Sequence, residues 1–170
     1  MSAAYPSRNV SPAQVAERLR SEKRVLAVSH EAPDGDALGC LSAFLLMCER
    51  LGIPGEGFIP GESGIPPEYL FLPRVKDVLR GDPPALPAST TVYFLDCASL
   101  LRSNAHKFPE DVVRVNIDHH GDNPGYGEYN LVDPAAASTT AILYEIFKAG
   151  DFPIDDEVAT GLYVGLVTDT

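Results

Sequence analysis

The stretch from Val25 to Gly39 constrains the fold more than any other part of the sequence. It begins with four apolar residues, which is typical of a buried β-strand. A turn punctuated by Pro and Gly follows and ends at Asp36, a good helix N-cap, before an apolar helix predicted over about 37–51. A strand, a polar turn and a helix in this order place His30 and Asp34 at the carboxyl end of a strand, where α/β sheets bind ligands.

The same alternation of strands and helices continues along the chain. Strands are predicted at about 24–29, 55–60, 90–96, 111–118 and 130–132, and helices at about 12–22, 37–51, 99–106, 138–149 and 155–167. This alternation predicts an α/β fold, namely a doubly wound, mainly parallel sheet with helices on both faces and right-handed crossovers. We expect one domain over 11–170, a frayed leader over 1–10, and a surface connection rich in Pro and Gly over 61–74.

Three of the predicted strands end in side chains that can bind metals, and an aspartate follows the last predicted helix. These side chains are His30, Asp34, Asp36, Asp96, Asp118, His119, His120 and Asp169. Parallel strands end at one edge of the sheet, so residues far apart in the sequence would gather there. Each aspartate alone has an alternative explanation as a turn or capping residue. The whole set of carboxylates and imidazoles nevertheless favours a site for two divalent metal ions.

Composition limits the partners of such a site. The 170 residues carry 24 acidic and 13 basic side chains, a net charge of −11. A chain this acidic is a poor partner for long duplex DNA, whose binding relies on Lys and Arg at phosphates, but a short nucleotide held by metal ions is compatible with it. The sequence shows no signal peptide and no apolar run long enough to span a membrane, so we expect a cytoplasmic location.

The three cysteines have no spacing pattern and are interpreted as reduced thiols, in agreement with a cytoplasmic location. Cys40 and Cys48 fall in the first long helix as small apolar packing residues. Cys97, directly after Asp96, has two interpretations, a soft metal ligand or a packing residue, and packing is favoured.

Four of these motifs, in this order, resemble those of a known family. The motifs are His30-x-x-x-Asp34-x-Asp36, the strand-ending Asp96, Asp118-His119-His120 and Asp169. They are similar to those of the DHH phosphoesterases, a superfamily that includes RecJ-type exonucleases and manganese-dependent pyrophosphatases. The stretches 29–39 and 116–138 look like the branch of bifunctional oligoribonucleases and 3′-phosphoadenosine-5′-phosphate phosphatases. The resemblance implies hydrolysis of very short RNAs and of that nucleotide bisphosphate with two divalent ions, Mn²⁺ first and Mg²⁺ as the alternative.

The resemblance also implies how the metal ligands are shared. By the family pattern, one ion is held by His30 and Asp34, the other by Asp36 and His119, while Asp96 bridges the two and Asp169 completes the cluster.

The same resemblance implies the residues that act on the substrate. The catalytic residues would be His120, which faces the scissile phosphate, and Asp118, which orients its neighbours. Arg102, Asn123 and Ser138 are candidates to hold the substrate phosphate or sugar. Two of them have alternatives, a solvated surface charge for Arg102 and a helix cap for Ser138.

Members of this superfamily carry a second, C-terminal lobe that grips the nucleotide. This chain stops directly after Asp169, so we expect it to represent the catalytic lobe alone. Three other interpretations stay open: a manganese-dependent inorganic pyrophosphatase, a non-catalytic metal-binding signalling domain, and a lobe that binds metals only to fold. The Asp133-Pro-Ala-Ala-Ala-Ser138 stretch favours the nucleotide branch. A homodimer is a further expectation.

Overall fold

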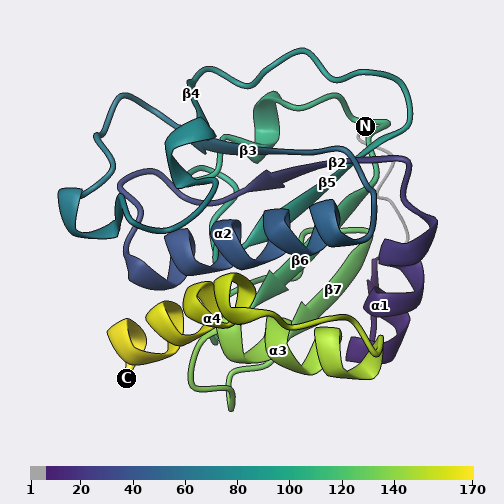
Figure 1. Ribbon diagram of the computed structural model, residues 1–170. Helices are drawn as coiled ribbons and strands as arrows, with labels where there is room; N and C mark the ends of the chain where they lie inside the picture. The colour runs from purple at the N-terminus through teal and green to yellow at the C-terminus, as the bar shows by residue number, and fades with distance from the viewer. Residues whose placement is uncertain (1–6) are drawn as a thin grey trace.

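The computed structural model describes residues 7–170, and these fold into a parallel β-sheet with α-helices packed against it (Figure 1). Within this part of the chain the sheet has seven strands in the order β1-β7-β6-β5-β2-β3-β4. The strands are β1 (Arg8–Asn9), β2 (Arg24–Val28), β3 (Gly55–Pro60), β4 (Leu79–Gly81), β5 (Thr90–Leu95), β6 (Arg114–Asp118) and β7 (Tyr129–Val132). The α-helices are α1 (Pro12–Ser21), α2 (Gly35–Arg50), α3 (Thr139–Ala149) and α4 (Asp156–Asp169), and short 3₁₀ helices lie at Pro67–Tyr69, Val75–Asp77 and Ala105–Lys107. The predicted α/β fold with a doubly wound, parallel sheet is confirmed.

The strand order reverses between β2 and β5. From β2 the chain moves outward through β3 and β4, then returns to the other side of β2 and continues the opposite way through β5, β6 and β7. Val28 of β2 pairs with Phe94 of β5, so these two strands end almost level. In open α/β sheets, ligands bind in the crevice beyond the strand ends at such a reversal. The residues that follow β2 and β5 therefore occupy the favoured position for a site.

The α-helices in residues 7–170 cover one face of the sheet, and loops cover the other. The core of the helical face joins α1–α4 to sheet residues such as Tyr93 and Ile117. On the opposite face, Phe58 and Phe94 pack against Phe108, with ring centroids 6.1 and 5.9 Å apart. The prediction that helices cover both faces of the sheet is therefore wrong, because the α-helices of residues 7–170 cover only one face. The crossover from β5 to β6 reverses direction and so passes over the second face, but it contains only turns and a 3₁₀ helix.

The helix predicted at about 99–106 does not form as an α-helix. The Ser99 hydroxyl accepts a hydrogen bond from the Leu101 N–H, and Asn104 adopts the left-handed region with φ of 52° just before the 3₁₀ helix Ala105–Lys107. Local hydrogen bonds of Ser side chains compete with helical bonding, and the left-handed conformation of Asn104 ends the helical path, which together explain the difference.

Helix α2 is buried from Gly35 to Cys48 because it lies between the sheet and α4 (Figure 1). It starts two residues before the predicted start. The N-cap is Asp34, whose carboxylate accepts a hydrogen bond from the Ala37 N–H at 3.0 Å, and not Asp36 as predicted. Asp36 instead lies in the first turn with 0% of its surface exposed, so its carboxylate is available for other contacts.

The edges of the fold differ from the sequence prediction in three places. Of the leader predicted over 1–10, residues 1–6 lie outside the described residues, while Arg8–Asn9 form β1 and pair with β7 at the edge of the sheet. Leu79–Gly81 form a short strand, β4, that was not predicted. Helix α4 continues to Asp169, two residues past its predicted end. None of the helices in residues 7–170 is long and apolar enough to cross a membrane.

Candidate metal centre

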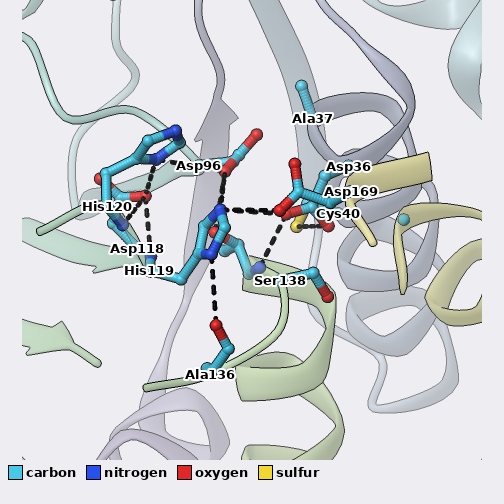
Figure 2. Close-up of polar contacts among 12 residues, drawn as sticks. Asp36, Ala37, Cys40, Asp96, Asp118, His119, His120, Ala136, Ser138 and Asp169 are labelled. Atoms are coloured by element: carbon cyan, nitrogen blue, oxygen red, sulfur yellow. Dashed lines mark hydrogen bonds and ion pairs between the residues drawn. The ribbon is translucent and has the colours of Figure 1, made fainter. Parts of the chain in front are cut away.

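The carboxyl ends of β2, β5 and β6 meet the first turns of α2 and α3 and the last turn of α4. Figure 2 shows that His119 points toward Asp96, Asp36 and Asp169. These residues come from four separate segments of the chain, as the strand-end pattern predicted. Two sets of three residues that share no member bring their donor atoms within 4.8 Å of one another: His30, Asp34 and Asp96, and Asp36, His119 and Asp169.

Asp96 belongs to the first set and also faces His119 of the second. It follows β5 directly and is 1% exposed. Its Oδ2 lies 3.7 Å from His30 Nε2, and its Oδ1 lies 3.8 Å from His119 Nε2. Its backbone has a φ of 57°, in the left-handed region, which aspartate tolerates better than most residues. Asp96 therefore presents one oxygen to each histidine, as a carboxylate shared by two ions would.

His30 is oriented by its other ring nitrogen. Nδ1 lies 2.9 Å from the carbonyl oxygen of Glu31 and 2.9 Å from Arg102 Nη2, while Nε2 lies 3.8 Å from Asp34 Oδ2. The tautomer that donates from Nδ1 to the carbonyl leaves Nε2 free as a metal ligand, which is the usual arrangement for a ligating histidine.

His119 has a buried nitrogen that no described group satisfies. Its Nε2 has no hydrogen-bond partner, yet it lies 3.2 Å from Asp169 Oδ2 and 4.0 Å from Asp36 Oδ2. Its Nδ1 lies 3.4 Å from the Ala136 carbonyl. Buried polar groups are rarely left unpaired. A nitrogen in this position, which faces carboxylates but forms no hydrogen bond with them, fits a cation between them.

The electrostatics of the site also fit a cation. Burial, together with the charge of Asp96, raises the pKa of Asp36 to about 6. Burial would raise the pKa of Asp96 as well, but the contact with His30 and the hydrogen bond from Thr139 outweigh burial and hold that pKa below its usual range. Two buried carboxylates this close repel each other, and a divalent ion would relieve the repulsion. Carboxylate oxygens mixed with imidazole nitrogens suit Mn²⁺ and similar ions.

Asp118 orients its neighbours. This fully buried carboxylate accepts hydrogen bonds through Oδ1 from the His119 N–H at 2.8 Å and from His120 Nδ1 at 2.7 Å, and through Oδ2 from Asn123 Nδ2 at 2.6 Å. Burial lowers the pKa of His120, but the contact with Asp118 outweighs it and the pKa is raised. His120 Nδ1 also lies 3.7 Å from Asp96 Oδ1, so the ring is held at the edge of the candidate metal centre.

The three predicted substrate-binding residues have different environments. Arg102 is exposed beside His30, where its guanidinium can reach an incoming anion. The Asn123 side-chain NH₂ is already engaged by Asp118, Asn116 and the Cys97 carbonyl. Ser138 is buried and caps α3 by accepting a hydrogen bond from the Ala141 N–H, which is the alternative that its sequence position left open.

Two residues next to Ser138 were missed. The backbone N–H groups of Thr139 and Thr140 both donate to the Asp36 carboxylate. The available signal was a pair of hydroxyl residues in the first turn of a predicted helix, where N–H groups have no helical partner.

The Cys97 thiol donates a hydrogen bond to the Ser99 carbonyl, and Cys97 belongs to neither of the two ligand sets.

Comparison with known proteins agrees with this geometry. The family model described as "DHH family, N-terminal domain" matches residues 24–166. The chain is 33% identical over 159 residues to the bifunctional oligoribonuclease and PAP phosphatase NrnA of Thermus thermophilus, covering 92% of this chain and 46% of that protein. It is 23% identical over 147 residues to a probable manganese-dependent inorganic pyrophosphatase of Lactobacillus acidophilus, covering 83% and 46%.

A solved structure shares the fold. An exopolyphosphatase-related protein from Bacteroides fragilis superposes with a TM-score of 0.80 at 20% identity, covering 94% of this chain and 50% of that one. The chain thus spans about half the length of the relatives it matches. The match over residues 24–166, together with the arrangement of the motif residues at one sheet edge, shows that the chain belongs to the DHH family.

Proposed function

We propose that this chain is the catalytic part of a metal-dependent phosphoesterase that hydrolyses short oligoribonucleotides and 3′-phosphoadenosine 5′-phosphate. The observation that carries the proposal is the pair of ligand sets at one sheet edge, in which Asp96 of the first set also faces His119 of the second and His119 Nε2 is buried without a hydrogen-bond partner. Support for the substrate class comes from the similarity to the Thermus thermophilus oligoribonuclease and PAP phosphatase.

In this proposal each residue of the centre has a defined task. His30 and Asp34 hold one divalent ion, Asp36, His119 and Asp169 hold the other, and Asp96 contacts both. The bound ions neutralise charge on the phosphate oxygens and make water a better nucleophile at neutral pH. Mn²⁺ is the proposed metal, since the donor set is mixed and one relative is a probable manganese-dependent enzyme.

The remaining residues of the centre would orient the phosphate. Asp118 holds the His120 ring through Nδ1, and His120 would donate a hydrogen bond to the scissile phosphate from its other nitrogen. Arg102 would bind a phosphate oxygen at the opposite side of the centre, next to His30. Asn123 would act through Asp118, because its amide is engaged there.

A side-by-side assay tests the proposal. The chain, freed of metal and reloaded with Mn²⁺, is given 3′-phosphoadenosine 5′-phosphate, a ribonucleotide dimer and pyrophosphate, with Asp96→Asn as the inactive control. Hydrolysis of the first two that needs Mn²⁺ and is lost in the variant supports the proposal. Turnover of none of them by a chain that binds Mn²⁺ would contradict it and favour a lobe that uses metals only for folding or signalling.

The second candidate function is a manganese-dependent inorganic pyrophosphatase. The similarity to the Lactobacillus acidophilus protein supports it, at lower identity than the match to the Thermus thermophilus protein. Selective hydrolysis of pyrophosphate in the same assay would favour this candidate.

A further inference from the structure

The first turn of α3 is arranged to serve the metal ligands. The first N–H groups of a helix have no helical partner. In α3 the third of them, from Ala141, is bonded to the Ser138 hydroxyl. The first two, from Thr139 and Thr140, donate to Asp36 Oδ2 and Oδ1 at 2.7 and 3.1 Å. The capping serine thus leaves two backbone donors for a carboxylate that belongs to another helix.

Thr139 also reaches the second buried carboxylate. Its hydroxyl donates a hydrogen bond to Asp96 Oδ1 at 2.9 Å, and the residue is 0% exposed. One residue therefore bonds to Asp36 through its backbone and to Asp96 through its side chain. These two carboxylates belong to the two different ligand sets, and Asp96 Oδ1 is the oxygen that faces His119.

The space around Asp36 leaves little room for it to move. A Cβ atom added to Gly165 of α4 would lie 2.4 Å from Asp36 Oδ1 and 2.4 Å from Thr140 Cγ2. The carboxylate is therefore confined by α4 on one side and by the α3 donors on the other. On the Asp96 side, the Thr139 hydroxyl and three histidines surround the carboxylate.

We propose that Thr139 is a positioning residue of the metal centre, which sets the separation and orientation of the Asp36 and Asp96 carboxylates so that each can serve its ion. This inference rests on the proposed two-ion centre. The hydroxyl bond matters most, because the backbone bond survives any side-chain substitution, while Asp96 loses a donor when the hydroxyl is removed. Hydrogen-bond partners of metal ligands commonly contribute 10- to 100-fold to metal affinity.

The test is the affinity for Mn²⁺ alone, measured by titration calorimetry and by the electron paramagnetic resonance signal of bound Mn²⁺. Thr139→Val removes the hydroxyl and keeps the shape of the side chain, and Thr139→Ser keeps the hydroxyl. Thr91→Val is the matched control: Thr91 is buried near the start of β5, and its hydroxyl donates to Glu22 Oε2 at 2.6 Å, at the end of the strand opposite Asp96.

We expect Thr139→Val to weaken Mn²⁺ binding by about 10- to 100-fold, with an altered resonance signal from the remaining ions. Thr139→Ser should bind nearly as the original chain does, and Thr91→Val should lose stability without losing Mn²⁺ affinity. If Thr139→Val does not fold, Thr139→Ala is measured in its place, because the alanine side chain is smaller than the space that the threonine occupies.

Three results would overturn the inference. Equal Mn²⁺ affinity in Thr139→Val and the original chain would do so while leaving the proposed function untouched. A loss of affinity in Thr139→Ser as large as in Thr139→Val would show a packing effect and not the hydroxyl bond. Failure of the original chain to bind Mn²⁺ would overturn both the inference and the two-ion centre on which it rests.

Discussion

Asp96 is the side chain on which both ligand sets depend, since its two oxygens face two different histidines. We expect Asp96→Asn to fold, because the amide has the shape of the carboxylate and the substitution removes one of the two buried negative charges of Asp36 and Asp96. The variant should bind neither ion well, because the shared carboxylate is lost. Mn²⁺ titration measures this, with far-ultraviolet circular dichroism to verify folding.

Asp34→Asn is the control for that experiment. Asp34 belongs to the first set alone and is exposed. Its substitution should therefore weaken the binding of one ion and leave the binding of the other unchanged. Equal Mn²⁺ occupancy in Asp96→Asn and the original chain would contradict the bridging role.

The raised pKa of Asp36 gives the metal centre a dependence on pH. With a folded-state pKa of about 6 against an ordinary value of 3.8, Asp36 stabilises the metal-free fold fully below its ordinary value. That contribution is lost as the pH rises through about 6. Metal binding needs the carboxylate, so protons compete with Mn²⁺ below that pH.

We therefore expect Mn²⁺ to raise the melting temperature more at about pH 7.5 than at about pH 5, where Asp36 is protonated. Thermal denaturation with Mn²⁺ and with a chelator, at each pH, measures the difference. His30, whose pKa is raised because contacts with Asp96 and the Glu31 carbonyl outweigh burial, must also lose its proton and acts in the same direction. A metal-induced shift that is the same at both pH values would argue against ligation by Asp36.

The positions of single side chains were predictable where the residue is itself a donor at a strand end. Asp96 and His119 lie together at the sheet edge, as the strand pattern predicted, while their roles stay a prediction. Asp36 was assigned a capping role that Asp34 fills instead, because both positions have the same turn chemistry. Thr139 was missed, because its bond to Asp36 depends on α3 packing against α2, and the hydroxyl pair in the first turn of the predicted helix does not by itself identify that partner.

Helices α2 and α4 approach each other at glycines. A Cβ atom on Gly39 would lie 2.5 Å from the Gly161 carbonyl oxygen and 2.9 Å from the Gly165 nitrogen, so backbone would have to shift. We expect Gly39→Ala to push the helices apart and to lower the free energy of unfolding by about 1–3 kcal/mol, as overpacking commonly does. Because α2 carries Asp36 and α4 carries Asp169, Mn²⁺ affinity should fall as well.

Urea denaturation and Mn²⁺ titration measure the two effects. Gly64→Ala is the control, since that glycine is exposed and a Cβ there meets nothing within 4 Å. An unchanged urea midpoint in Gly39→Ala would mean that the close approach of these helices contributes nothing to stability.

The secondary structure elements were predictable to the extent that hydrophobic periodicity marks them. β2 and β5 follow their apolar runs, and α3 begins after the predicted cap, Ser138. The loops that cover the second face were not predictable, because 99–106 has the composition of a helix, but its serines form local hydrogen bonds and Asn104 adopts a left-handed backbone conformation. β1 and β4 were missed because strands of two or three residues are too short to show an alternating hydrophobic pattern.

The whole molecule is strongly acidic, with a net charge of −11. Two divalent ions would reduce this to −7, by adding four positive charges, and would leave a molecule that still repels polyanions. We expect kcat/KM to fall as RNA length increases from a dimer to about 20 nucleotides, since each added phosphate is repelled and few basic groups neutralise it.

The measurement is a set of RNAs of increasing length at low and at moderate ionic strength. Added salt should narrow the difference between short and long substrates, because it screens repulsion. A preference for the longest RNA at low salt would contradict this expectation.

The proposed metal ligands are far apart in the sequence, so they are synthesised at different times. His30 follows the second strand, and Asp169 lies in the final turn of α4. At synthesis rates of about 5–20 residues per second, the roughly 140 residues between these two positions take about 7–28 s to make. A nascent chain therefore carries its first histidine and carboxylates for many seconds before the last ligand exists. In the proposed assignment, the set of His30, Asp34 and Asp96 is complete once β5 and Asp96 have been made, whereas the set of Asp36, His119 and Asp169 is complete only after α4 has been made.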